Sequence, residues 1–163
     1  MDVNGFKGPN SEARNGKQYD IRSFKVARFS KGCAGNDING IGCVYQLPSY
    51  SPIKGGSEEM KKWDPKWTAE KIGSYANYNN YWAGAKKACD DIGMSLPDKS
   101  KLESLAKKTT AEKEQLGLPT SGWFWSSSET NATTYAYRVN FGNGSTLDDY
   151  KDSSIEKVLC VGD

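Results

Sequence analysis

The sequence contains no histidine. This absence excludes Ser–His and Cys–His nucleophile pairs and every metal site that depends on imidazole ligands. The four cysteines also lack C-x-x-C spacing, which argues against a zinc site. An enzyme built from this chain would have to rely on carboxylates, lysine or cysteine alone. We therefore predict no catalytic and no metal-binding residues.

An excess of charge of one sign is also lacking. The 22 basic and 20 acidic residues are interspersed and leave a net charge of +2. No basic patch typical of a nucleic-acid partner is visible, and none is predicted. No apolar run is long enough to span a membrane, and no signal peptide is recognisable. If the protein is exported, we expect this chain to be a mature or truncated form.

Aromatic residues and glycine are plentiful by contrast. Aromatics make up 12% of the 163 residues, and there are 17 glycines. Disordered chains are poor in aromatics, so this composition predicts a folded protein. The length suffices for one domain with a core, and the glycines predict many turns.

The even number of cysteines predicts two disulfides rather than a metal site. Three pairings are possible. We favour Cys33–Cys43, which closes a short loop rich in Gly and Asn, together with Cys89–Cys160, which would join a helix to the last strand. Such loop-rich, glycine-rich chains are typical of exported domains. The alternative is four reduced thiols in a cytosolic protein.

Helical periodicity is clearest over residues 81–92, and Gly93 is well placed to end that helix. A second helix is predicted from Asp98, as N-cap, to about residue 108. The capping-box spacing of Ser100 and Glu103 leaves a start two residues later open. Four strands are predicted after the helices, over residues 123–126, 135–141, 145–150 and 155–161. Together they predict the α+β class, loop-rich, with two helices packed on twisted antiparallel sheets.

Four segments carry a family resemblance: YWAGAKKACDDIGMSLPDKSKLESL, GWFWSSSET, YAYRVNFGNG and VLCVGD. In order and spacing they are similar to the bacterial C-type-lectin-like domain at the C-terminus of collagen-like adhesins, the Lcl C-terminal family, over residues 80–161. The same fold is similar to that of formylglycine-generating enzymes and of variable proteins diversified by retroelements. The resemblance implies a C-type-lectin-like fold.

The chain departs from the pattern of that family and of its calcium-dependent relatives. Leu159 and Asp163 stand where the family usually has arginine. No E-P-N, Q-P-D or W-N-D triplet is present, so the resemblance does not imply calcium-mediated sugar binding.

The beginning of the chain resembles a different family. DVNGFKGPN, followed by Gly16 and Tyr19-Asp20, is similar to a motif of prepilin-type proteins, over Asp2 to Val26. The hydrophobic N-terminal helix of those proteins is absent from this sequence. We therefore predict a pilin-like segment over residues 1–55 and a C-type-lectin-like domain over residues 56–163, forming one compact unit.

Aromatic and polar side chains between residues 123 and 150 form the predicted ligand-binding set. Aromatic rings provide large contact areas and serve as binding hot spots. The alternative is that the aromatics fill the core, which we favour for Trp125 and Tyr135, and that the polar residues are ordinary solvated loop residues. The predicted set, expected on one face, is Trp123, Glu129, Asn131, Tyr137, Arg138, Asp148, Asp149 and Tyr150.

No cofactor is predicted. Calcium is kept as an alternative at Asp2 and Asn4, where Asx-turn chemistry explains the residues equally well, and at Asp148, Asp149 and Asp152. A redox pair of Cys89 and Cys160, as in formylglycine-generating enzymes, is not expected. The positions of both cysteines match the structural bridge of the lectin-like family.

These observations predict a non-enzymatic, extracellular adhesion or ligand-binding module, displayed on a pilin-like surface protein of a bacterium. Diversification by a retroelement is a further hypothesis. Its partner would be a protein or glycan on another cell or a phage, with other pilin subunits as additional partners. One alternative is a structural minor pilin, in which the lectin-like part serves assembly. Another is an enzyme of the sulfatase-modifying type, which the missing histidine and the missing active cysteine pair oppose.

Overall fold

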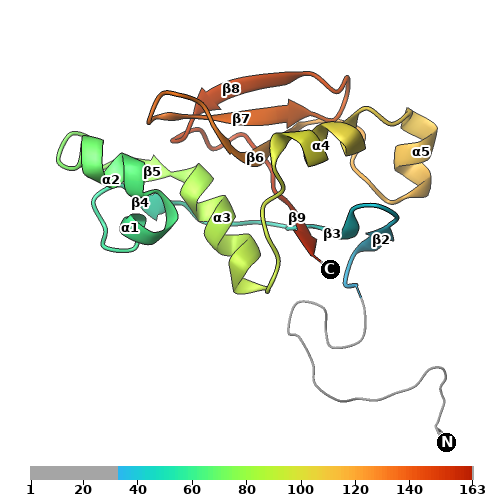
Figure 1. Ribbon diagram of the computed structural model, residues 1–163, viewed down its shortest axis with the longest axis horizontal. Coiled ribbons are helices and arrows are strands. Elements are labelled where there is room, and N and C mark those ends of the chain that lie inside the picture. The colour runs from blue at the N-terminus through green and yellow to red at the C-terminus, as the bar shows by residue number, and fades with distance from the viewer. Residues whose placement is uncertain (1–32, 163) are drawn as a thin grey trace, which may run out of the picture. The chain divides into compact units, whose positions relative to one another are not determined.

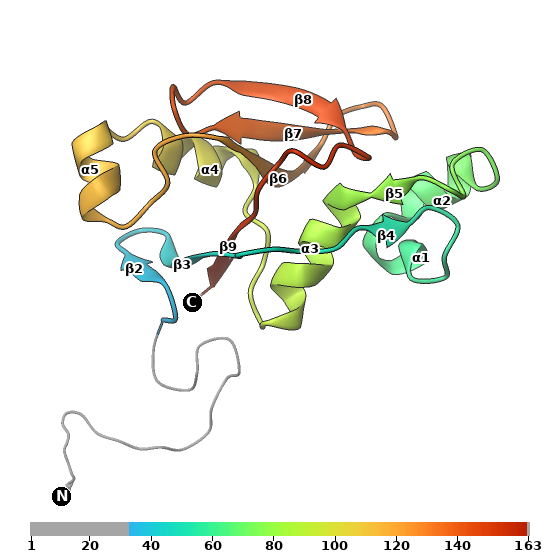
Figure 2. The ribbon, with the colours of Figure 1, turned by 180° about the vertical axis from the view of Figure 1, so that it is seen from behind.

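The structure is a computed structural model that describes residues 33–162. The chain divides into two units, 1–34 and 35–163, and all elements below belong to the second. This part contains five helices and three small antiparallel sheets joined by many loops (Figure 1), also seen from behind in Figure 2. The predicted α+β class is therefore confirmed, and the architecture is compatible with a C-type-lectin-like fold.

The C-terminal sheet has the order β6-β7-β8, and neighbouring strands run antiparallel. Its strands are β6 at Trp123–Glu129, β7 at Tyr135–Asn140 and β8 at Thr146–Tyr150. The register shifts between Trp125 and Glu129, so β6 continues past an irregularity and is longer than predicted. Alternating apolar side chains of these strands supply one side of the main core.

Helix α4, Lys99–Ala106, supplies the other side of that core (Figure 1). Its start is set by Asp98, whose side chain accepts a hydrogen bond from the Lys101 amide at 2.8 Å, as predicted for the N-cap. The apolar stripe of the helix packs on the sheet. The residues in contact include Leu102, Leu105, Phe124, Val139 and Phe141, all fully buried.

Helix α3, Tyr81–Asp91, is the second predicted helix to be confirmed. The Asn80 side chain caps it by accepting a hydrogen bond from the Ala83 amide at 2.8 Å. Gly93 follows its end with a φ of 74°, a backbone conformation that glycine adopts without steric cost.

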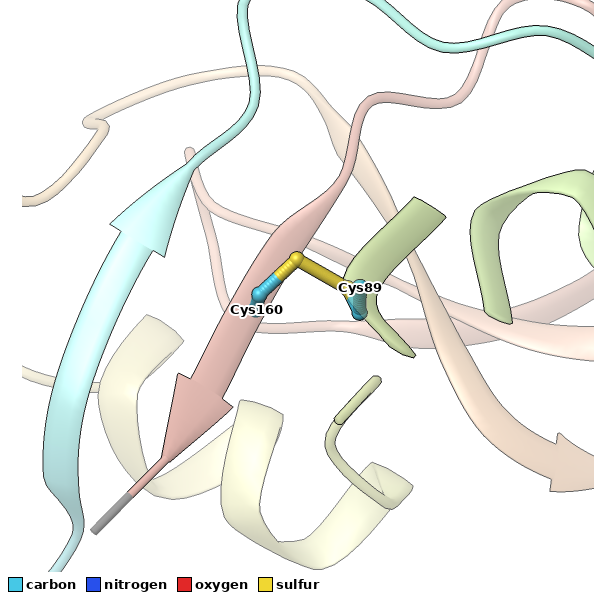
Figure 3. Close-up of a disulfide and its surroundings, with 2 residues drawn as sticks. All are labelled: Cys89 and Cys160. Atoms are coloured by element: carbon cyan, nitrogen blue, oxygen red, sulfur yellow. A yellow bond between two sulfur atoms is a disulfide. The ribbon is translucent and has the colours of Figure 1, made fainter. Parts of the chain in front are cut away.

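A disulfide joins α3 to the last strand, β9 at Leu159–Gly162 (Figure 3). It pairs Cys89 with Cys160, with their Cα atoms 5.5 Å apart. Cys33 and Cys43 are also disulfide-bonded, and no described cysteine is free. The prediction of disulfides over free thiols is thus confirmed, and the Cys89–Cys160 pairing is the predicted one.

The remaining elements form two smaller sheets and three short helices. The second sheet has the order β2-β3-β9, and the third pairs β4 with β5. The strands are β2 at Asn36–Ile38, β3 at Gly42–Gln46, β4 at Ile53–Lys54 and β5 at Asn79–Asn80. The helices are α1 at Met60–Trp63, α2 at Pro65–Lys71 and α5 at Thr110–Gln115. Around α1 and α2 a second core forms from Ile53, Met60, Trp67 and Ala83.

The two ends of the chain differ in how far the structure tests their predictions. The strand predicted over residues 155–161 is wrong in its first half, because β9 begins at Leu159 and the preceding residues form a loop with one bridge, between Lys157 and Phe124. The prepilin-like motif over Asp2 to Val26, on which the predicted pilin-like segment 1–55 rests, lies outside the described residues. Within residues 33–162, no helix has the length and apolar character needed to cross a membrane.

Candidate functional site

The predicted ligand-binding residues lie on both faces of the C-terminal sheet rather than on one. Residues paired across strands point to the same face, and neighbours along a strand alternate. The register pairs Tyr135 with Tyr150 and Tyr137 with Asp148, and it pairs Trp125 with Arg138 and Ala136 with Asp149. Trp123 pairs with Asn140, two residues from Arg138, and so belongs to the second set. We call the first set the Tyr150 face (Tyr135, Tyr137, Asp148, Tyr150) and the second the Arg138 face (Trp123, Arg138, Asp149). The expectation of a single face is therefore corrected.

On the Arg138 face, the charged side chains are paired with one another. The Arg138 guanidinium lies 4.0 Å from the ring centroid of Trp123. Its Nη1 is 3.2 Å from a carboxylate oxygen of Glu156 and 3.5 Å from one of Asp149. Only 15% of the Arg138 side chain is exposed. These contacts engage the guanidinium within the fold.

Glu156 was not part of the predicted set, although it organises this cluster. Burial raises its pKa to about 8, and the hydrogen bond and negative charge of Asp149 add to the effect. Burial acts in the same direction on Asp149, but hydrogen bonds from Glu156, the Tyr150 amide and Ser153 outweigh it and lower the pKa of Asp149. Because the pKa of Glu156 is raised to about 8 and that of Asp149 is lowered, the pair favours one shared proton, held on Glu156 and directed toward Asp149. Oε2 of Glu156 accepts a hydrogen bond from Arg138.

A second charged cluster surrounds the fully buried Lys151. Its Nζ lies 3.0 Å from an oxygen of Asp64 and 2.7 Å from one of Glu129, and 4.3 Å from the ring centroid of Trp82. Asn80 donates a hydrogen bond to Asp64 at 2.9 Å. The predicted ligand-binding residue Glu129 is thus already engaged by an internal ammonium group, even though its side chain stays partly exposed.

The Tyr150 face keeps more of its surface open. Tyr150 is 54% exposed, and its ring lies 4.4 Å from that of Tyr135. Tyr135 itself is half-buried rather than in the core as expected, whereas Trp125 is fully buried as expected. A side-chain hydrogen bond in which the Tyr135 hydroxyl donates to Tyr150 raises the pKa of Tyr135 to about 12. Tyr150 is therefore a fixed ring that remains accessible.

The other members of the predicted set lie around this open surface. Tyr137 has the ammonium of Lys99 4.0 Å from its ring centroid, which covers part of it. Asp148 is exposed. Asn131 is exposed too, and its backbone carbonyl accepts a hydrogen bond from Lys66 at 3.2 Å.

Tyr150 borders a pocket of about 250 Å³, which we call the Tyr150 pocket. Its aromatic walls include three residues outside the predicted set, Trp67, Tyr75 and Tyr78. The Trp67 and Tyr75 rings are 5.1 Å apart and tilted by 51°, and the Tyr75 and Tyr78 rings are 4.7 Å apart and tilted by 72°. The full lining is Trp67, Tyr75, Tyr78, Thr134, Tyr150, Lys151 and Asp152. The arrangement can enclose a small group between aromatic faces and polar atoms.

The sequence does contain a signal for the tyrosines of the pocket lining that the predicted set omitted. Tyr75, Tyr78 and Tyr81 recur every three residues in a stretch rich in Asn, and an exposed run of tyrosines is typical of contact surfaces. That this stretch faces Tyr150 depends on the packing of α2 and β5 near the end of β8, which no local pattern encodes.

Two further kinds of site were considered from the sequence, a redox cysteine pair and a calcium site. Cys89 and Cys160 are both fully buried and bonded to each other, which fits a structural bridge. Across residues 33–162, no three acidic or cysteine side chains are placed to hold a metal ion, so Asp148, Asp149 and Asp152 do not converge on one point. The other alternative, at Asp2 and Asn4, lies outside the described residues.

Comparison with known proteins gives one match. The family model InvE_AD, described as an adhesion domain, matches residues 44–161. The match runs from β3 to β9 and includes every residue that lines the Tyr150 pocket. Neither the curated proteins nor the solved structures contain a match.

Proposed function

The chain belongs to the adhesion-domain family InvE_AD, and from this premise we propose that it is a non-enzymatic adhesion module that binds its ligand in the Tyr150 pocket. An adhesion domain stabilised by disulfides belongs at the cell surface or outside the cell. The ligand would be a protein or glycan carried by another cell or a phage.

One observation carries this proposal: the Tyr150 pocket is an open, aromatic-lined hollow next to charged clusters that are closed. Tyr78 and Tyr150 are 45% and 54% exposed, and both line the same pocket. Clustered exposed aromatics mark binding sites because they bury a large area with little loss of conformational entropy. The Arg138 face offers a ligand fewer unpaired side chains, because Arg138 already contacts Trp123, Asp149 and Glu156.

The experiment compares adhesion by beads coated with the full chain and with single-residue variants. Tyr78→Ala and Tyr150→Ala should each reduce the number of bound cells strongly, because each removes a pocket wall. Glu58→Ala is the control, since the Glu58 side chain is 89% exposed and does not line the pocket. Adhesion that survives both tyrosine substitutions would contradict the proposal.

We further propose the finer setting that the resemblances suggest. In it, this C-type-lectin-like module is displayed by a pilin-like surface protein of a bacterium, and a retroelement diversifies it. The gene upstream of Asp2 should then encode a prepilin leader, and sibling genes should differ mainly between residues 123 and 150. Siblings that vary elsewhere would contradict the diversification hypothesis.

A second candidate function, assembly into a larger structure, is favoured by two exposed apolar side chains. Leu147 is 54% exposed and pairs with Arg138 in the register, and Ile155, 63% exposed, precedes Glu156, which contacts Arg138. Apolar groups around a closed polar cluster suit a protein interface. Concentration-dependent self-association, measured by sedimentation and removed by Leu147→Ser, would support assembly. A monomer at all concentrations would contradict self-assembly.

A further inference from the structure

We infer that the Tyr150 pocket takes the ammonium end of a lysine side chain presented by a protein partner. This inference rests on the proposed adhesive function and names the chemistry of its ligand. Three properties of the pocket carry it: the angles between its rings, its local charge and its size.

The ring geometry favours an enclosed cation over a stacked planar group. The Trp67 and Tyr75 rings are inclined by 51°, and the Tyr75 and Tyr78 rings by 72°. The Tyr75 and Tyr78 rings meet edge to face, so they present no single flat surface, and Trp67 is only 1% exposed. A sugar ring stacks best on one flat aromatic face, whereas a compact cation can be attracted by the exposed parts of Tyr78 and Tyr150 together.

The pocket lining contains one carboxylate without a cation partner among the described residues. Asp152 lines it and makes no ion pair with any other residue of the described range 33–162. The single ammonium in the lining, Lys151, is already bound by two carboxylates, Asp64 and Glu129. Lys71 is a second cation nearby, with its Nζ 5.7 Å from the ring centroid of Tyr75. Asp152 is thus a carboxylate available to a ligand cation.

The size and polar groups of the pocket select among cations. Its volume of about 250 Å³ lies below the range of about 300–1,000 Å³ that holds drug-sized ligands, so it suits a single side chain. Asp152 and the Thr134 hydroxyl can accept hydrogen bonds. A primary ammonium donates three such bonds from one compact centre, a quaternary ammonium donates none, and a guanidinium is planar. Lysine therefore fits best.

The test is an NMR titration of the full chain with Nα-acetyl-lysine methylamide. Amide signals of Thr134, Lys151 and Asp152 should shift, with a dissociation constant on the order of 1 mM for so small a ligand. The affinity should fall as the NaCl concentration rises from about 50 to about 500 mM. Three matched ligands accompany it: the norleucine analogue, which lacks the charge, the arginine analogue, and tetramethylammonium. Methyl glucoside is the neutral sugar.

Variants locate the site. Asp152→Asn and Tyr78→Ala should each weaken lysine binding by about five- to tenfold. Glu58→Gln removes a carboxylate that is 89% exposed and outside the pocket, and it should leave binding unchanged. Equal binding of the norleucine, arginine or tetramethylammonium probes, or binding of the glucoside alone, would overturn the inference. If lysine fails to bind while Tyr78→Ala and Tyr150→Ala still abolish adhesion, only the ligand class is wrong. If those variants adhere normally, the proposed function itself is wrong.

Discussion

The two faces of the C-terminal sheet contain similar residue types and differ in how those residues are paired. On the Arg138 face, a cation, an aromatic ring and two carboxyls contact one another and leave little of the cluster free. On the Tyr150 side, a ring that is half exposed meets further tyrosines and a carboxylate without an ion pair among the described residues. Similar composition therefore gives a structural cluster in one place and an open pocket in the other. The deciding property is whether each charge has found an internal partner.

Lys151→Ala should produce the largest effect and tests whether paired charges are structural. Removing the ammonium leaves the buried Asp64 without its cation, which should lower the free energy of unfolding by about 3–5 kcal/mol. Urea unfolding measures this change. The exposed Lys157→Ala serves as control and should stay within about 0.5 kcal/mol of the parent. A small effect at Lys151 would mean that its contacts contribute little.

Arg138→Ala should come next and sharpens the contrast between the faces. It removes charge-assisted hydrogen bonds from a group that is still 15% exposed, so we expect a loss of about 2 kcal/mol in urea unfolding. Arg138→Lys keeps the charge but lacks the planar group that covers Trp123. Its free energy of unfolding should therefore lie between those of the parent and of Arg138→Ala. Adhesion by the folded variant should be unchanged. A selective loss of adhesion would place the ligand on the Arg138 face instead.

The carboxyl pair of the Arg138 face predicts a pH dependence of stability. The folded protein binds the Glu156 proton more tightly than the unfolded chain, because its pKa rises from 4.5 to about 8. The stability that this proton provides is therefore complete below about pH 4.5 and is lost as the pH rises through about 8.

Thermal unfolding between those pH values measures this loss. Glu156→Gln removes the titrating group and should flatten that part of the curve. Glu58→Gln, at a side chain that is 89% exposed, should not. An unchanged curve in Glu156→Gln would mean that Glu156 is ionised throughout.

Tyr150→Ala should have the smallest effect of these substitutions on stability. It should nevertheless strongly reduce adhesion. Its ring contact with Tyr135 is worth about 1 kcal/mol, so the melting temperature should change little. Tyr150→Phe keeps the ring and should retain most of the adhesion. A Tyr150→Ala variant that is strongly destabilised would show that this ring serves the fold, and the contrast between the two faces would fail.

Local patterns were sufficient to predict several elements. The helix over Tyr81–Asp91, the Asp98 cap and the three strands of the C-terminal sheet each depend on periodicity or capping over a few residues. The loop before β9 was missed because Val158 is buried like a strand residue although its segment is irregular. Side-chain burial alone does not distinguish the two.

The candidate site was predicted less completely. Tyr150 and Asp148 do lie on an accessible face, but Glu129, Arg138 and Asp149 are held by internal partners. Those partners come from distant parts of the chain: Lys151 also binds Asp64, 87 residues away. Tyr75 and Tyr78 were absent from the predicted set for the same reason, since they reach the pocket from the turn between α2 and β5.

The sequence by itself determined the α+β class, the absence of histidine chemistry and the use of cysteine in disulfides, because these follow from composition and from patterns within a few residues. Only the tertiary structure decided which charged and aromatic side chains stay available. Arg138 and Glu129 found partners in the fold, whereas Asp152 and Tyr150 were left facing a pocket. The physical reason is that pairing and burial depend on contacts between segments far apart in the chain, and desolvation makes those contacts decisive for buried charges.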